Sequence, residues 1–320
     1  HELVKRRKFR GLSVKEKIMY YKYFLNWYYP FYKLKNKRHK KFNEFIKKYL
    51  IKNEIGYLDN EYDIVIYGSD QIWSKFPEIS SFDKVFFGDA SVNAKKRIAF
   101  SASMGVLDIE KNDIDFLRNS LNNFFAISVR EDDLFYAVKS LNLSPEIGVY
   151  KTIDPVFLLE KSEWMKLNSK RLINEKYLLY YDFQNDKETS DIVYTIANIL
   201  GIKVFTLVGG AYSKEKKENY LLTAGPLEFI SLFQFADFVV SSSFHGVAFS
   251  IVFEKQFYAR QNWNTQRVSS LLMTLGIEDR FLTSVTDVNL NKIIDYEKVK
   301  MLLDKEKKHA KDFLIRSIDI

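Results

Sequence analysis

Short apolar runs rich in β-branched and aromatic residues recur along the chain, and most of them end at small or polar residues. This pattern is typical of buried strands in parallel sheets. It predicts strands at residues 62–67, 97–100, 125–129, 177–181, 204–208, 238–240 and 256–259. Segments with helical spacing alternate with them, at residues 114–123, 189–200, 247–253, 267–275 and 296–318. The alternation predicts an α/β fold with two Rossmann-like domains that face each other across a cleft.

The first series of strands and helices ends near Leu159, and the second begins near Lys176. A length of 320 residues also suits two domains better than one. We therefore expect an N-terminal domain at residues 1–170, a C-terminal domain at residues 171–292, and a last helix at residues 293–320 that packs back across both.

Residues 1–53 differ from the rest of the chain in charge. They hold 17 Lys/Arg and 3 Asp/Glu, a net charge of +14, whereas the remainder carries −6. Helical spacing predicts helices at residues 14–27 and 38–50, with Pro30 between them, and aromatic residues lie among the lysines. Such helices either cover a sheet with their lysines in solvent or lie on an anionic membrane. No recognised nucleic-acid module is visible, so nucleic acid is not an expected partner.

The chain contains no cysteine, which excludes disulfides and thiolate catalysis and suits a reducing compartment. No apolar run reaches the roughly 18 residues that a membrane-spanning helix needs. No signal peptide opens the sequence. We expect a cytoplasmic protein with peripheral contact to the inner membrane face through residues 1–53.

The sequence around His245 predicts an anion site. The strand at residues 238–240 is followed by Ser241, Ser242 and Ser243, and then by His245 and Gly246 where a buried helix begins. The unpaired N–H groups and the positive end of a helix favour an anion at this position. The missing side chain of Gly246 would let a ligand approach the backbone. The alternative is a serine cap beside a purely structural histidine.

Two further strands end at residues that suit ligand binding. Ser69, Asp70 and Gln71 follow the strand at residues 62–67, and Arg130 follows the strand at residues 125–129. Loops beyond the carboxyl ends of strands form the ligand sites of open α/β sheets. The alternative for Asp70 is a turn residue, and for Arg130 it is a salt bridge to the neighbouring Glu131 or Asp132.

Several motifs now stand in one order, and together they resemble the polysaccharide pyruvyl transferase family. They are YDIVIYGSDQIW at residues 62–73, RIAFSASMG at 97–105, SVRED at 128–132, DPVFLL at 154–159, GPLEF at 225–229, SSFHG at 242–246 and RVSSLLMTLGIEDR at 267–280. The resemblance covers roughly residues 55–315 and implies a glycosyltransferase-B-like fold. The opening strand and Asn-Tyr-Gly-type loop usual in the family are not found ahead of this region, so the N-terminal βα unit is expected to be incomplete.

The resemblance also implies a reaction in which phosphoenolpyruvate donates its enolpyruvyl carbons to two hydroxyls of a sugar, forming a cyclic ketal. Arg130, Arg267, Ser243 and Gly246 are then the expected donor-binding residues, with Arg260 a weaker substitute. The C-terminal domain is the expected donor side of the cleft, and the N-terminal domain the acceptor side. His245 is the expected general acid. Asp70 is the expected catalytic partner, with Ser69 and Gln71 binding the acceptor from the N-terminal domain.

No metal and no cofactor are expected, because phosphoenolpyruvate is itself the donor substrate. The acceptor is expected to be a sugar or a lipid-linked glycan of a cell-surface polysaccharide. Two other functions stay open. One is a nucleotide-sugar glycosyltransferase of the same architecture, and the other is a non-catalytic carbohydrate- or membrane-binding relative.

Overall fold

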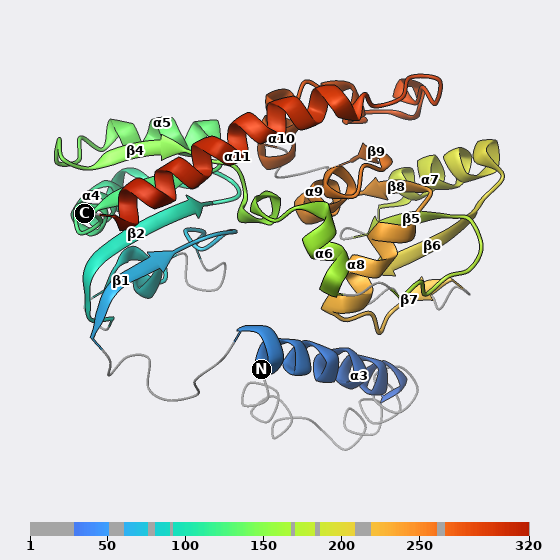
Figure 1. The fold of residues 1–320 in the computed structure, drawn as a ribbon, viewed down its shortest axis with the longest axis horizontal. Helices are drawn as coiled ribbons and strands as arrows, with labels where there is room; N and C mark the ends of the chain where they lie inside the picture. The colour runs from blue at the N-terminus through green and yellow to red at the C-terminus, as the bar shows by residue number, and fades with distance from the viewer. Residues whose placement is uncertain are drawn as a thin grey trace, which may run out of the picture.

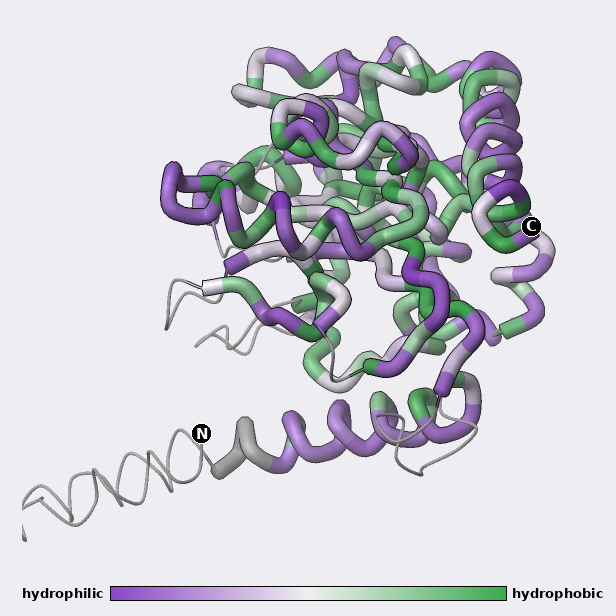
Figure 2. Tube along the Cα trace, turned by 90° about the vertical axis from the view of Figure 1, so that its left-hand side faces the viewer, coloured by the Kyte–Doolittle hydropathy of each residue, from purple (hydrophilic) through white to green (hydrophobic). Residues whose placement is uncertain are grey.

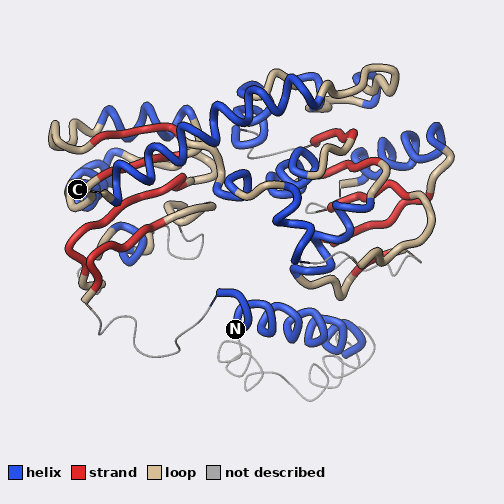
Figure 3. Tube along the Cα trace, viewed as in Figure 1, coloured by secondary structure: helices blue, strands red, loops and turns tan. Residues whose placement is uncertain are grey.

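A computed structural model gives the fold, and it describes residues 29–50, 61–75, 81–89, 92–167, 170–182, 186–208, 219–260 and 266–319. Two parallel sheets lie side by side, each with helices packed against it (Figures 1 and 3). The predicted fold class, an α/β protein with two Rossmann-like domains, is therefore confirmed.

The N-terminal sheet has the strand order β1-β2-β3-β4, and all its pairs are parallel. Within the described residues, β1 forms one edge of this sheet. The elements of this domain are β1 (Tyr62–Tyr67), η3 (Lys84–Phe87), β2 (Ala94–Ala102), η4 (Lys111–Asp113), α4 (Ile114–Leu121), β3 (Ala126–Val129), α5 (Asp132–Ser140) and β4 (Gly148–Lys151).

The C-terminal sheet has the strand order β7-β6-β5-β8-β9, again parallel throughout. The order reverses between β5 and β8, which is the switch point where such sheets bind ligands. The elements of this domain are β5 (Tyr177–Asp182), α7 (Lys187–Leu200), β6 (Lys203–Val208), β7 (Tyr220–Leu221), α8 (Pro226–Phe235), β8 (Phe238–Ser241), α9 (Phe244–Val252), β9 (Gln256–Ala259), α10 (Gln266–Thr274), η6 (Glu278–Arg280) and η7 (Val285–Asp287).

Strands β4 and β7 are not predicted from the hydrophobic pattern. Strand β7 has two residues, and β4 reads GVYK, with a glycine and a lysine at its ends and no fully buried residue. Runs this short and this exposed carry too little alternation to stand out from a loop.

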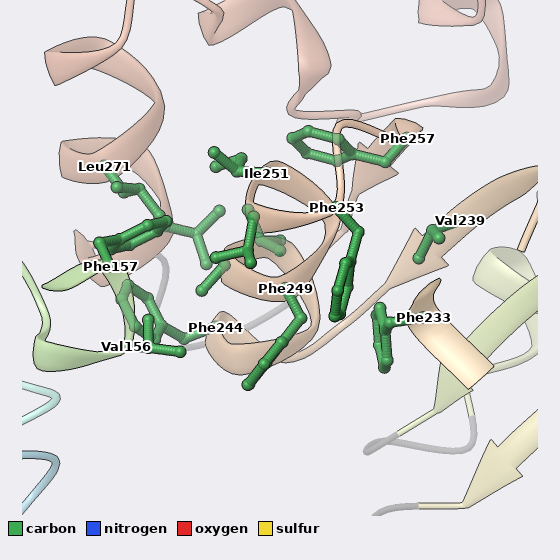
Figure 4. Close-up of a cluster of buried hydrophobic side chains, with 14 of the residues drawn as sticks. Val156, Phe157, Phe233, Val239, Phe244, Phe249, Ile251, Phe253, Phe257 and Leu271 are labelled. Carbon is green, nitrogen blue, oxygen red and sulfur yellow. The ribbon is translucent and has the colours of Figure 1, made fainter. Parts of the chain in front are cut away.

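The connection between the domains is part of the central core. It runs through η5 (Pro155–Leu158) and α6 (Lys161–Leu167). Val156 and Phe157 of η5 pack with Phe244 of α9 and Leu271 of α10 in one buried cluster (Figure 4). The same cluster extends to Phe100 in the N-terminal sheet, so the two domains share a continuous apolar core.

The basic N-terminal segment contributes one helix to the described structure. Helix α3 (Tyr29–Phe45) continues as the π-helical turn η2 (Ile46–Leu50) and lies against α8. The prediction of a separate helix starting at residue 38 is wrong, because the helix already begins at Tyr29. Pro30 sits in its first turn, where a missing N–H group costs nothing. The predicted helix at residues 14–27 lies outside the described residues.

The last helix, α11 (Tyr296–Ile318), crosses from one domain to the other (Figure 1). At its start, the Tyr296 hydroxyl donates a hydrogen bond to the Lys255 carbonyl of the C-terminal domain. At its end, the Lys96 ammonium of β2 donates to the Ser317 carbonyl over 3.0 Å. The helix therefore ties the two sheets together outside the core.

Phe313 anchors the end of α11 on the N-terminal sheet. It is buried, and its ring centroid lies 6.0 Å from that of Phe100 and 5.3 Å from that of Tyr150. We expect Phe313→Ala to lower the free energy of unfolding by about 3–5 kcal/mol, because a large buried ring is lost. Met301→Ala, on the same helix at 66% exposure, should change it by no more than about 0.5 kcal/mol. Urea denaturation of both variants measures this, and equal stabilities would show that the contact does not hold the helix.

Candidate active site

Three loops from the two sheets meet where the domains face each other. Strand β1 ends at the loop that holds Ser69 and Asp70, β3 ends at Arg130, and β8 leads through Ser243 into α9. All three loops follow the carboxyl ends of parallel strands, and the last lies at the switch point between β5 and β8. Helix α10 adds Arg267 from the C-terminal domain.

The centre of the site is a cluster of two arginines and two carboxylates. Asp70 is ion-paired with Arg130 at 3.2 Å and with Arg267 at 3.1 Å, so one carboxylate bridges the two domains. Arg130 also forms a close ion pair with Asp154. Both guanidinium groups lie over the Phe244 ring, at 4.9 and 5.7 Å from its centroid. The alternative partners proposed for Arg130 from the sequence, Glu131 and Asp132, are thus not its ion-pair partners.

The two carboxylates of the cluster differ sharply in exposure. The Asp154 side chain is 5% exposed, whereas that of Asp70 is 59% exposed. Asp70 also has a backbone φ of 59°, in the left-handed region that few non-glycine residues adopt. Asp70 is therefore the solvent-accessible carboxylate of the cluster, and Asp154 is the buried one.

Charge at the site keeps Asp70 ionised. Burial by itself would raise its pKa, but His245, Arg130 and Arg267 together lower the pKa of Asp70 below its ordinary value. A carboxylate with a lowered pKa is a weak proton acceptor. While it is paired with the arginines, Asp70 is thus better suited to balance charge than to deprotonate a hydroxyl.

Helix α9 brings His245 to the same place. The Nε2 atom of His245 lies 4.0 Å from the Asp154 carboxylate. Ser243 is the N-cap residue, but its side chain caps none of the N–H groups of α9, so the alternative of a serine cap does not hold for Ser243. Ser241 instead bonds within the loop, because its hydroxyl oxygen accepts a hydrogen bond from the Ser243 N–H at 3.1 Å.

Gly246 has a packing role that the sequence does not reveal. A Cβ atom there would lie 2.0 Å from the Ser241 hydroxyl oxygen and 2.8 Å from the Tyr181 ring. The space is already filled by the protein, so the lack of a side chain does not open a path for a ligand. The Gly246 N–H lies in the first turn of α9, where backbone donors have no partner within the helix.

The remaining predicted residues lie at different distances from this cluster. The Ser69 hydroxyl donates to Asp154 over 3.3 Å, and Gln71 is exposed in the same loop as Asp70. Arg260 is buried elsewhere on the C-terminal sheet, where it pairs with Glu188 and donates to the Thr283 carbonyl. The structure thus offers Arg260 no part in the cluster.

Two buried acids lie at the site that the sequence does not single out as site residues, Asp154 and Glu131. Asp154 lies in the DPVFLL motif, where the first series of strands and helices ends, and the signal that could single it out is an Asp before Pro, a common helix start. Glu131 is buried beside Arg130, and its Oε1 atom accepts a hydrogen bond from Ser103 at 2.5 Å. Burial raises the pKa of Glu131, and its Oε2 atom has no hydrogen-bond partner in the described part of the chain.

Helix α3 reaches the carboxyl edge of the C-terminal sheet. The Arg38 guanidinium donates to the carbonyl of Val208, the last residue of β6, over 2.9 Å. Lys41 is ion-paired with Glu228 of α8. The other lysines of the helix are exposed, and Figure 2 shows it as a largely hydrophilic rod beside the body.

Metal clusters and membrane-spanning helices are both absent from the residues that the structure describes. No cluster of three or more His, Asp or Glu side chains with the arrangement of a metal site occurs among them. None of their helices is both long and apolar enough to cross a membrane.

Solved structures similar to this chain are distant in sequence. An uncharacterised protein from Klebsiella pneumoniae subsp. pneumoniae is 16% identical, with 78% of this chain and 87% of that chain covered and a TM-score of 0.48. The wall teichoic acid polymerase TagF is 12% identical, with 88% and 86% covered and a TM-score of 0.39. Among curated protein sequences, none matches this chain.

The family model for polysaccharide pyruvyl transferase matches residues 6–264. The match begins well before the resemblance seen in the sequence, at residues 55–315, and so includes most of the basic N-terminal segment. It stops just short of Arg267. Because the matched residues make up most of the 320-residue chain, the protein belongs to the polysaccharide pyruvyl transferase family.

Proposed function

We propose that the protein transfers the enolpyruvyl group of phosphoenolpyruvate to two hydroxyls of a sugar in a cell-surface polysaccharide or its precursor, with formation of a pyruvate ketal. The observation that carries this proposal is the convergence of Arg130 and Arg267, one from each domain, on a single carboxylate. The donor has a phosphate and a carboxylate, and arginine forks bind both kinds of group.

Donor binding replaces Asp70 in this scheme. The phosphate and carboxylate of phosphoenolpyruvate take over the contacts that Asp70 makes with Arg130 and Arg267. The free N–H groups at the start of α9, including that of Gly246, add donors for the phosphate. Asp70 is released toward the acceptor, where Ser69 and Gln71 of the same loop help to orient the sugar hydroxyls.

His245 supplies the proton for the donor carbon. Its imidazolium protonates the methylene carbon of the donor, and the first sugar hydroxyl forms a bond to the adjacent carbon. The bond from that carbon to the phosphate oxygen then breaks, and phosphate leaves with the electron pair. The second hydroxyl closes the ketal. One hydroxyl proton replaces the proton taken from His245, and the other leaves with phosphate.

The proposal is tested by incubating the protein with phosphoenolpyruvate and a panel of glycan acceptors. We expect release of phosphate together with a product heavier by one pyruvyl ketal. We expect His245→Asn to lower kcat roughly 10²–10⁴-fold, the usual contribution of a positioned general acid, with little change in the donor Kd. His309→Asn, an exposed histidine on α11, is the matched control and should retain activity.

Two results would contradict this scheme. A near wild-type kcat for His245→Asn would remove the general acid. Thermal stabilisation by nucleotide sugars and not by phosphoenolpyruvate would favour a glycosyltransferase of the same fold instead.

We also propose reversible contact between the basic N-terminal segment and anionic lipid, which would bring the enzyme to the inner face of the membrane. In the described part of that segment, Arg38 and Lys41 face the C-terminal domain, whereas the other lysines of α3 are exposed, as is Phe42. Binding should therefore be electrostatic, at about 1 kcal/mol for each lysine near the lipid. Co-sedimentation with anionic vesicles should fall steeply as salt rises. Equal binding to neutral vesicles would rule this contact out.

A further inference from the structure

Asp154 is held rigidly where the chain leaves the N-terminal domain. Its side chain is buried, and its Oδ1 atom accepts a hydrogen bond from the Val156 N–H at 2.9 Å, which caps η5. Val156 itself belongs to the shared core of the two domains. The position of this carboxylate is thus fixed by the interior of the protein and not by a surface loop.

The other oxygen of Asp154 faces three groups of the candidate site. Its Oδ2 atom is ion-paired with Arg130, accepts a hydrogen bond from Ser69 at 3.3 Å, and lies 4.0 Å from Nε2 of His245. Arg130 and Ser69 come from the N-terminal domain, whereas His245 comes from the C-terminal domain. One carboxylate oxygen therefore touches both halves of the site.

Asp154 and Asp70 differ in what an arriving donor can do to them. Asp70 is exposed, so a phosphate can take its place at low cost. Asp154 is buried, and breaking a buried ion pair leaves an uncompensated charge, which is far more costly. Asp154 therefore keeps its contacts in the donor complex while Asp70 gives way.

We propose that Asp154 is a positioning residue for the transfer. It holds the guanidinium of Arg130 and the ring of His245 in one relative geometry, so that an anion bound by the arginine lies beside the proton that the histidine delivers. This inference rests on the proposed function. Asp154 makes no contact with substrate in it and acts only through Arg130 and His245.

The test compares anion affinity and turnover in Asp154→Asn, which retains an oxygen to cap η5. Loss of a negative charge would by itself strengthen anion binding, whereas loss of position weakens it. We expect the Kd for phosphoenolpyruvate and for inorganic phosphate, both measured by calorimetry, to rise about tenfold. We expect kcat to fall about 10²-fold, as misplacement of reacting groups does. Asp154→Glu, which keeps the charge but shifts it by one methylene, should show the same loss of kcat.

The coupling between substitutions at Asp154 and His245 distinguishes a positioning role from a general loss of structure. If Asp154 acts through His245, the double variant Asp154→Asn/His245→Asn should lose much less activity than the product of the two single losses. Asp83→Asn is the matched control, because Asp83 caps η3 in the same way, accepting from the Val85 N–H at 3.1 Å, away from the site. It should leave both affinity and kcat unchanged.

The possible outcomes decide separately on this inference and on the proposed function. Unchanged or tighter anion binding in Asp154→Asn, or fully additive losses of kcat, would overturn the positioning role. If the wild type binds phosphate but not phosphoenolpyruvate, the proposed function fails. In that case a weaker affinity of Asp154→Asn for phosphate still supports the hold on Arg130.

Discussion

The ion pairs of Asp70 with Arg130 and Arg267 are the interaction on which the rest of the site depends. Two guanidinium groups, one buried and one partly buried, repel each other unless an anion lies between them, and removal from solvent strengthens that repulsion. Asp70 is that anion in the structure, and it comes from one domain to pair with an arginine of the other. The contact between the two domains and the charge balance of the two arginines therefore depend on the same carboxylate.

The fold makes this arrangement possible. Parallel sheets place all their strand-end loops on one edge, so Asp70, Arg130 and His245 arrive at a common region from three different strands. The core under them is continuous through η5 and α9, and α11 ties the sheets together outside it. A site built on such a rigid base holds its two arginines at fixed positions.

Much of the site could be predicted from the sequence, because its residues directly follow apolar strand runs. Arg130 and the His245 loop are examples. The bridge between Asp70 and Arg267 could not, since the two residues are 197 positions apart and meet only when the domains dock. The place of Asp154 in the site could not be predicted either, because the residues around it in the sequence indicate only the end of the first domain. Its contacts with Arg130 and His245 come from two different domains. The glycine at 246 serves packing against Ser241, which no local pattern reveals.

In the proposed function, the donor takes the place of Asp70 on Arg130 and Arg267. Calorimetric titration of phosphoenolpyruvate into the wild type, Asp70→Asn and Arg267→Ala tests it most directly. We expect Asp70→Asn to bind the donor about tenfold more tightly, because a competing carboxylate is gone. We expect Arg267→Ala to bind it more weakly, by about 1.5–3 kcal/mol. Arg118→Ala, which removes a half-exposed arginine paired with Asp115 away from the cluster, should bind as the wild type does. Weaker or unchanged donor binding in Asp70→Asn would show that the donor does not replace Asp70 on the arginines.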